Sequence, residues 1–134
     1  MKAWFKSIEN FPEGTTFPKE KVLNELCFDE RGLIPVIAQD MESGEVLMFA
    51  WMNREALDET LATGRMCYWS RSRQCLWRKG ESSGHFQALH ALSIDCDGDV
   101  LLAKIEQKDA ACHTNRRSCF YLHVDGDSVT LSSL

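Results

Sequence analysis

The most informative segment of the chain is residues 93–121, which begins Ser93-Ile94-Asp95-Cys96-Asp97-Gly98-Asp99 and ends Ala111-Cys112-His113-Thr114-Asn115-Arg116-Arg117-Ser118-Cys119-Phe120-Tyr121. Three carboxylates alternate around one thiol, and two more thiols and an imidazole follow. Carboxylate oxygens are the ligands that Mg²⁺ and Ca²⁺ prefer, whereas thiolates suit Zn²⁺. The segment therefore predicts two metal sites of different chemistry, built side by side.

Three simpler interpretations compete with this one. An EF-hand loop would use the three aspartates and Glu106, but it needs glycine at its sixth position, which here is Val100. A structural zinc finger normally has closely paired cysteines, and no such pair exists among positions 27, 67, 75, 96, 112 and 119. An ordinary surface turn beside inert, buried cysteines remains open on these residues alone.

Length and composition predict a single domain. A chain of 134 residues with a hydrophobic content of 44% is large enough to bury one core. We assign the domain to residues 1–134, with residues 1–16 as an N-terminal arm. The net charge of −5 argues against a nucleic-acid partner, because non-specific binding depends on attraction of basic side chains to phosphates.

The sequence predicts neither export nor a membrane partner. Residues 1–10 lack the apolar stretch and small-residue cleavage site of a signal peptide. The longest apolar run, residues 47–52, is far too short for a membrane span. We therefore expect a cytoplasmic protein whose cysteines are reduced or metal-bound.

Two helices and a series of strands are expected. Pro18 fits the first position of one helix, and Asn53 should cap a second helix that continues to Leu61 and stops at Gly64. Pro35 argues that its strand lies at a sheet edge or that the strand begins there. The expected strands are residues 33–38, 46–51, 66–69, 86–94, 100–105, 119–124 and 128–131, the last two forming a hairpin. The fold class is α+β, mainly antiparallel sheet with two or three short helices.

A second group of residues suits a nucleotide. Basic side chains between Tyr68 and His85 are interspersed with serines and glycines, in a protein that is acidic overall. Small residues bring backbone N–H groups close to an anion, and arginine grips phosphate oxygens with two hydrogen bonds. Trp69 and Trp77 could stack on a base. The alternative is a solvated basic loop without a ligand.

Four motifs together resemble the phosphoribosyl-AMP cyclohydrolase family. They are Trp69-Ser70-Arg71-Ser72-Arg73, Trp77-Arg78-Lys79-Gly80-Glu81-Ser82-Ser83-Gly84-His85, Asp95-Cys96-Asp97-Gly98-Asp99 and Cys112-His113-Thr114-Asn115-Arg116-Arg117-Ser118-Cys119-Phe120-Tyr121. The resemblance covers about residues 28–124, and the joint spacing of the motifs makes it specific. One departure is Asn115, where the family usually has glycine. Asparagine tolerates a left-handed backbone, so we expect the turn to survive.

The resemblance implies an enzyme of the third step of histidine biosynthesis, an intertwined homodimer that uses Zn²⁺ and Mg²⁺. Its substrate is 1-(5-phosphoribosyl)-AMP, in which it hydrolyses the N1–C6 bond of the adenine ring. Carried over by motif, the zinc ligands are Cys96, Cys112 and Cys119, drawn from both subunits. The magnesium ligands are Asp95, Asp97 and Asp99.

The remaining site residues are candidates of different strength. Three thiolates leave a fourth zinc position for water, but their charge acidifies that water less than neutral ligands would, so a base would help. His113 is the nearest candidate for the base, and a hydrogen-bonded position behind the ligands is its alternative. The candidates for substrate binding are Trp69, Arg71, Arg73, Lys79, Ser82, Ser83, His85 and Arg116.

Backbone periodicity adds a geometric expectation. In an extended segment successive side chains point to opposite faces, so Asp95 and Asp97 should face away from Cys96. Gly98 can then curl the chain and bring Asp99 round to the other carboxylates. Zinc and magnesium are therefore expected in separate sites.

Two rival functions belong to other classes. A zinc-dependent nucleotide deaminase also attacks a ring carbon beside nitrogen, but its H-x-E and P-C-x-x-C signatures are absent. A metal-stabilised nucleotide-binding module without chemistry is the second rival. A bound zinc with an exchangeable water would distinguish the enzyme from that module.

Overall fold

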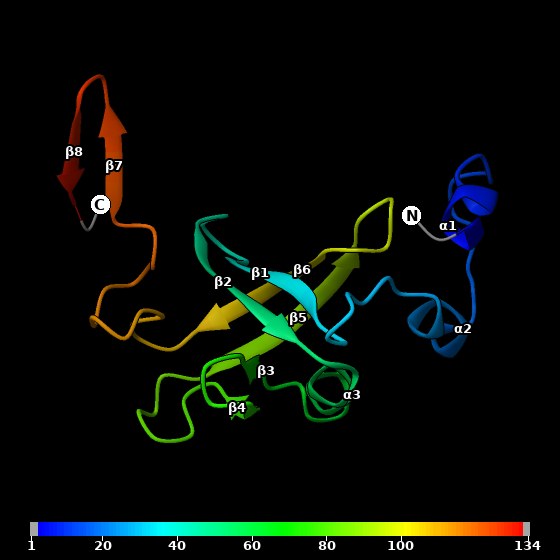
Figure 1. The fold of residues 1–134 in the computed structure, drawn as a ribbon, viewed down its shortest axis with the longest axis horizontal. Helices are drawn as coiled ribbons and strands as arrows, with labels where there is room; N and C mark the ends of the chain where they lie inside the picture. Colours follow the sequence, from blue (N-terminus) through cyan, green and yellow to red (C-terminus); the bar gives the residue numbers. More distant parts are fainter. Residues whose placement is uncertain (1–2, 133–134) are drawn as a thin grey trace.

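A four-stranded sheet is the centre of the computed structural model, which describes residues 3–132 (Figure 1). Its strand order is β2-β1-β6-β5, where β1 pairs parallel with β6 and the other neighbours are antiparallel. Two separate hairpins, β3–β4 and β7–β8, complete the β structure. The strands are β1 Ile34–Asp40, β2 Val46–Met52, β3 Cys67–Ser70, β4 Cys75–Arg78, β5 Gln87–Ile94, β6 Leu101–Gln107, β7 Leu122–Asp125 and β8 Ser128–Leu131. With the three helices α1 Ala3–Ile8, α2 Lys19–Asn24 and α3 Arg54–Thr63, the predicted α+β, mainly antiparallel class is confirmed.

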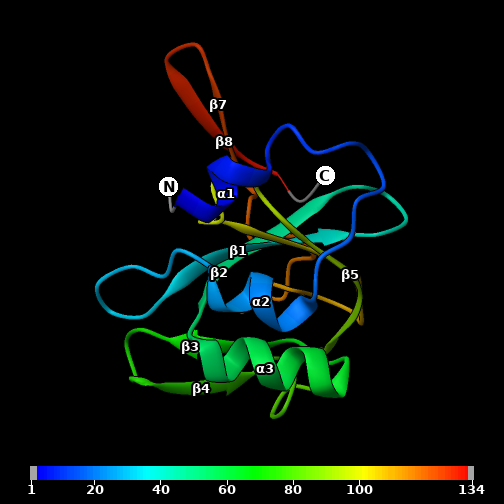
Figure 2. The same ribbon diagram turned by 90° about the vertical axis from the view of Figure 1, so that its right-hand side faces the viewer.

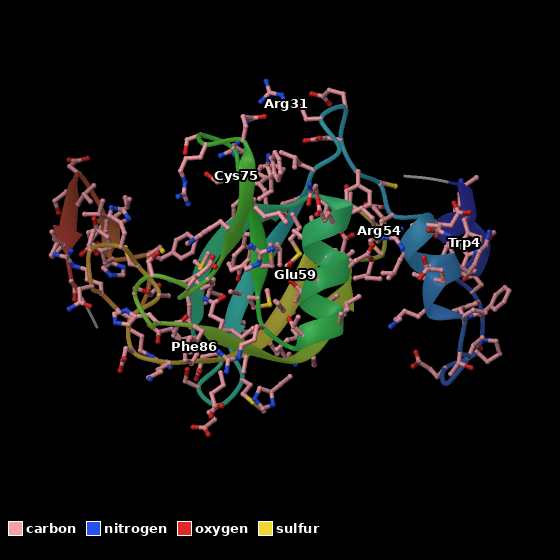
Figure 3. The ribbon with its side chains drawn as sticks, turned by 90° about the horizontal axis from the view of Figure 1, so that it is seen from below. Trp4, Arg31, Arg54, Glu59, Cys75 and Phe86 are labelled. Atoms are coloured by element: carbon pink, nitrogen blue, oxygen red, sulfur yellow. The ribbon has the colours of Figure 1, made fainter. Side chains whose placement is uncertain are left out.

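Helix α3 begins and ends where local signals predict. The side chain of Asn53 accepts a hydrogen bond of 2.8 Å from the N–H of Ala56 and so satisfies one of the free donors of the first turn. Gly64 closes the helix in the left-handed conformation, with φ of +75°. Arg54, in the first turn, hydrogen-bonds to Glu20 and Asn24 and so holds α2 against α3 (Figure 3).

The core lies between the sheet and a layer made by α3 and the β3–β4 hairpin, which cover one face (Figure 2). Side chains at alternate positions of β1 and β6 fill it: Ile34, Val36, Ala38, Leu101, Ala103 and Ile105. The opposite face carries apolar side chains that remain partly or largely exposed. We call this the open face, made by Pro35, Ile37, Phe49, Trp51 and Leu102.

The structure corrects the expected position of β1 in the sheet and adds a pairing partner for it. Strand β1 is central, so the expectation that Pro35 marks a sheet edge is wrong, and its alternative, the start of a strand, is confirmed. Pro35 faces Trp51 of β2, whereas the ladder to β6 begins only at Val36, so the missing N–H of proline falls before that ladder. The parallel pairing of β1 with β6 was not expected.

The two ends of the chain extend from opposite sides of this body (Figure 1). Within the expected N-terminal arm, residues 3–8 form α1, which buries Phe5, while residues 1–2 lie outside the described part. The β7–β8 hairpin is confirmed, and it stands away from the sheet with every residue exposed. Among the helices of residues 3–132, none has the length and apolarity that crossing a membrane requires.

Candidate active site

Residues 110–119, the cysteine loop, fold back on themselves through backbone hydrogen bonds. The N–H groups of Ala111 and Cys112 donate to the carbonyls of Arg117 and Arg116, each at 3.0 Å. Asn115 sits at the tip with φ of +67°, so the expectation that asparagine keeps the left-handed turn is confirmed. Backbone hydrogen bonds within the loop therefore fix the position of Cys112.

Cys119 is tied to the sheet at the other end of the same loop. Its N–H donates to the carbonyl of Leu47 at 2.7 Å, and the Ser118 hydroxyl donates to the carbonyl of Val46 at 2.9 Å. These bonds attach the loop to the start of β2 and bring the Cys119 thiol within hydrogen-bonding reach of the Cys112 sulfur.

The pKa values of these two neighbouring thiols are shifted in opposite directions. Burial alone would raise the pKa of Cys112, but hydrogen bonds from Thr114, whose hydroxyl lies 3.0 Å from the sulfur, and from Cys119 outweigh it, and the net pKa is lowered. Desolvation raises the pKa of Cys119 to about 11, and the neighbouring Cys112 adds to that rise. Cys112 is thus the first of the pair to become a thiolate, the form that binds metals.

A cavity of about 580 Å³ lies in front of this pair. Residues 79–85, which follow Arg78 and which we call the basic loop, supply six of its other lining residues: Lys79, Gly80, Glu81, Ser82, Ser83 and His85. Desolvation lowers the pKa of Lys79, and the charges of Cys112 and Cys119 partly oppose this fall. The cavity brings together six of the predicted site residues with the two thiols: Arg73, Lys79, Ser82, Ser83, His85 and His113.

The other three substrate candidates do not line this cavity. Trp69 and Arg71 line a separate pocket of about 340 Å³, and the Arg71 guanidinium lies over the Trp51 ring at 4.8 Å. The Arg116 guanidinium lies over the Tyr121 ring at 4.1 Å, and its charge helps to lower the pKa of Cys112. Two tryptophans, Trp69 and Trp77, were expected as possible stacking partners of a base. Of these two, Trp77 lines the cavity.

The basic loop owes its shape to one glycine. Gly80 has φ of +85° and is buried, and a Cβ at this position would collide with the backbone of Phe86. This close approach brings the two ends of residues 81–85 together, and Glu81, Ser82, Ser83 and His85 from this segment line the cavity. Glycine is the only residue without a Cβ, so the loop depends on it.

Residues 95–99, the acidic turn, differ from the extended geometry expected for them. Strand β5 ends at Ile94, and the ligand atoms of Asp95, Cys96 and Asp97 all lie within 4.8 Å of one another. The expectation that the two carboxylates face away from the thiol is therefore wrong. The physical reason is the turn itself, because the alternation of side chains holds only while the backbone is extended.

Asp95 also holds the acidic turn closed. Its Oδ1 accepts the N–H groups of Asp99 and Val100 at 3.0 and 3.3 Å. Burial alone would raise the pKa of Asp95, but these hydrogen bonds outweigh it and the pKa is lowered. A hydrogen bond with Asp95 raises the pKa of Asp99. Asp99 is not among the residues whose ligand atoms all lie within 4.8 Å of one another, so its place beside both other carboxylates stays a prediction.

The N-terminal segment packs against the acidic turn. The Cys27 N–H donates to the Gly98 carbonyl at 2.8 Å, and its thiol approaches the Asp97 carbonyl at 3.4 Å. The Phe5 ring of α1 occupies the space that a Cβ of Gly98 would need. Helix α1 and the turn lie side by side in Figure 1.

The three predicted zinc ligands are not gathered within one chain. Cys96 precedes β6, whereas Cys112 and Cys119 follow it, so they lie beyond opposite ends of this strand (Figure 1). At about 3.3 Å per residue, the two ends of the seven-residue strand β6 are roughly 20 Å apart. Each chain therefore places Cys112 and Cys119 beyond one end of β6 and Cys96 beyond the other end.

Comparison with known proteins identifies the family. The sequence model of the phosphoribosyl-AMP cyclohydrolases matches residues 48–121. The chain belongs to this family. The resemblance expected from the four motifs, and the expectation of an enzyme, a hydrolase of the histidine pathway, are thereby confirmed.

Relatives named phosphoribosyl-AMP cyclohydrolase match between about three quarters and nearly all of the chain. The protein of Alcanivorax borkumensis is 58% identical over 127 residues, which cover 95% of this chain and 89% of that protein. The protein of Chromohalobacter salexigens is 54% identical over 133 residues, covering 99% and 91%. The protein of Bordetella parapertussis is 66% identical over 103 residues, covering 76% and 77%.

The cyclohydrolase match includes the parts of the chain that carry the site. Residues 48–121 contain the basic loop, the acidic turn and the cysteine loop. They exclude α1, α2 and the β7–β8 hairpin. The segments that pack against the acidic turn or extend from the body are thus outside the part that the family model describes.

Proposed function

We propose that this chain hydrolyses the N1–C6 bond in the adenine ring of 1-(5-phosphoribosyl)-AMP, giving the phosphoribosylformimino-aminoimidazole carboxamide ribotide. Membership of the cyclohydrolase family supports the reaction. The observation that carries the site is the meeting of the Cys112 and Cys119 thiols at a cavity that is also lined by Arg73, Arg78 and Lys79. That combination suits a substrate with two phosphates and a ring to be opened.

Zinc fits the donors at this cavity. Two neighbouring thiols, one of them with a lowered pKa, are ligands that zinc prefers to magnesium or calcium. We infer that Cys96 supplies the third thiolate. A bound zinc would lower the pKa of a water in its remaining position and so supply the nucleophile at neutral pH.

The other residues of the cavity bind the substrate and move protons. His113 is exposed on the cavity wall, and we assign to it the acceptance of a proton from the attacking water. The ring of Trp77 offers a surface for the adenine base. The phosphates are held by Arg73, Lys79, Ser82 and Ser83, with His85 beside them.

A homodimer would complete the zinc site, and two observations support it. Cys96 and the cysteine loop of its own chain lie beyond opposite ends of β6, which is roughly 20 Å long, and this supports a second copy as the source of the Cys96 thiol. The open face, with Phe49 49% exposed, and the apolar side chains of the β7–β8 hairpin, with Val124 79% exposed, offer the uncovered surface that a second copy would bury. The proposed assembly is an intertwined homodimer with zinc ligands shared between subunits.

Magnesium is proposed at the acidic turn, held by Asp95, Asp97 and Asp99. Magnesium commonly uses one or two carboxylates together with substrate phosphates. The Cys96 thiol lies within 4.8 Å of the Asp95 and Asp97 carboxylates, so a subunit that gives this thiol to a cavity also brings magnesium ligands to its mouth. Separate positions for the two metals stay a prediction.

The cytoplasm is the proposed location. All six cysteines are free thiols: Cys27, Cys67, Cys75, Cys96, Cys112 and Cys119. Thiols persist in a reducing compartment and are oxidised to disulfides outside it.

An ultraviolet assay of phosphoribosyl-AMP tests substrate and metal together. We expect consumption of the substrate by the purified protein, its loss after treatment with a chelator, and its recovery when zinc is returned. Unchanged turnover by protein whose zinc content is near zero would contradict zinc dependence. Binding of the substrate without turnover, in zinc-loaded protein, would favour a nucleotide-binding module.

A further inference from the structure

Two glutamines are buried where the sheet meets the cavity. Gln87 of β5 and Gln107 of β6 face each other across the antiparallel ladder, with exposures of 0% and 6%. A buried amide costs free energy unless its donors and acceptors are all satisfied. The partners of these two side chains therefore show what they are buried to do.

The amides form a directed chain of hydrogen bonds. The hydroxyl of Tyr68 donates to Oε1 of Gln87, and Nε2 of Gln87 donates to Oε1 of Gln107 at 2.8 Å. Since Oε1 of Gln107 is occupied as an acceptor, its Nε2 is directed away from Gln87 with both of its hydrogens. Gln87 thus sets the orientation of the Gln107 amide.

The Nε2 of Gln107 donates to backbone carbonyls on both sides of the cavity. It lies 3.2 Å from the carbonyl of His85, at the end of the basic loop. It lies 2.8 Å from the carbonyl of Lys108 and 3.5 Å from that of Ala110, where the chain enters the cysteine loop. One amide group therefore joins the two walls that carry the phosphate-binding candidates and the thiols.

We propose that Gln107 is a positioning residue that sets the spacing between the basic loop and the cysteine loop, and that Gln87 acts through it by fixing the direction of its amide. Neither side chain lines the cavity. The inference rests on the proposed use of this cavity as the substrate site. Displacing a wall by about 1 Å can cost about 100-fold in rate, because reacting groups must meet in a narrow range of geometries.

Three substitutions separate positioning from general stability. Gln107→Met keeps the length of the side chain and removes its donors. Gln107→Glu points oxygen instead of N–H at the loop carbonyls. Gln87→Glu leaves the Gln107 side chain itself unchanged but removes the donor to its oxygen, so that the Gln107 amide is driven to reverse and present its oxygen to those carbonyls.

The matched control is Thr60→Val. Thr60 is fully buried, and its hydroxyl bonds to the N–H and the carbonyl of Cys67, a residue that belongs to neither loop and does not line the cavity. It removes buried hydrogen bonds without touching a cavity wall. We expect it to lower the melting temperature and to leave kcat/KM within twofold of wild type.

The experiment measures kcat/KM for phosphoribosyl-AMP at a temperature where each variant is folded, together with amide hydrogen exchange. We expect kcat/KM to fall about 10- to 100-fold in Gln107→Glu and Gln87→Glu. Exchange should rise in residues 79–85 and 110–119 ahead of the rest of the chain. Gln107→Met, the mildest change, should show the same pattern to a smaller extent.

The outcomes distinguish this inference from the assignment of the site. Unchanged exchange in the two loops, or failure of Gln107→Met to fold at all, would overturn the positioning role and leave the site assignment intact. Loosened loops with unchanged kcat/KM would overturn the use of this cavity by the substrate, and the inference with it.

Discussion

Cys112 and Cys119 show how neighbouring thiols acquire different roles from their surroundings. The sequence makes them equivalent, but only Cys112 receives hydrogen bonds from Thr114, and only Cys119 has its pKa raised to about 11 by desolvation. The distinction depends on distances across the cysteine loop, which spacing along the chain does not give.

Loss of any of the three predicted zinc ligands should abolish function. We expect Cys96→Ala, Cys112→Ala and Cys119→Ala each to lose bound zinc and nearly all activity, because a site with two thiolates holds zinc less well. Metal content and turnover are measured on the same preparation. Cys27→Ala and Cys75→Ala are the controls and should retain both. Full activity in a ligand variant with zinc stoichiometry near zero would refute the assignment.

Asp40 should make the stability of the fold sensitive to acid. Its carboxylate accepts the backbone N–H and the hydroxyl of Ser43 at 2.9 and 2.8 Å, and Arg117 donates at 3.1 Å. These interactions, of which those with Ser43 are largest, hold its pKa below the ordinary value despite burial. The folded-state pKa is thus lower than the unfolded one, so the stabilisation is complete above about pH 4 and is lost as pH falls through the folded-state pKa.

The substitution Asp40→Asn tests whether the Asp40 charge stabilises the fold and whether that stabilisation is lost in acid. We expect it to lower the free energy of unfolding by about 1.5–3 kcal/mol at pH 7, the range for a hydrogen-bonded charged group. The difference from wild type should narrow at pH 3, where the wild-type carboxylate begins to be protonated. Urea titrations at the two pH values measure it, and an equal loss at both would show that the charge is not the cause.

Among the elements, α1 contacts the acidic turn through the Phe5 ring. Gly98 of the acidic turn has φ of +72°, and the Phe5 ring stands where its Cβ would be. Gly98→Ala should therefore destabilise the chain in two ways, by about 1–2 kcal/mol from the left-handed backbone and further from the collision with Phe5.

A double-mutant cycle separates these two contributions. Gly98→Ala should cost less in the background of Phe5→Ala than in wild type, because only the backbone strain remains there. Chemical unfolding of the four proteins gives the coupling free energy. Strict additivity would mean that α1 does not press on the turn in solution.

Elements whose boundaries are local could be predicted, and elements set by distant contacts could not. Helix α3 is delimited by the cap at Asn53 and the left-handed Gly64, both written in its own sequence. The central position of β1 depends on pairing with β6, more than sixty residues later. The side-chain directions in the acidic turn were predicted wrongly, because Gly98 indicates that the chain bends but not at which residue the bend begins. At the site, Trp69 and Trp77 have similar sequence contexts, and only the pairing of β3 with β4 distinguishes them.

At the scale of the molecule, the separation of Cys96 from the other two thiols predicts complementation between damaged subunits. We expect a mixture of Cys96→Ala and Cys112→Ala chains, unfolded and reassociated together, to recover about a quarter of wild-type activity. Random pairing makes about half of the dimers mixed, and each mixed dimer has one intact site and one with both lesions. Each variant refolded alone is the control and should stay inactive. No recovery, with mixed dimers demonstrated, would mean that the ligands come from a single chain.

Strand β6 keeps Cys96 apart from the other two predicted zinc ligands of its own chain. If its ends serve two different centres, a solitary chain has no complete catalyst, and specific activity must decline on dilution below the dissociation constant of the pair. Output would then rise faster than in proportion to protein abundance while the chain is scarce. Halving expression in that range would lower the flux through the step by more than half, so gene dosage itself would regulate it.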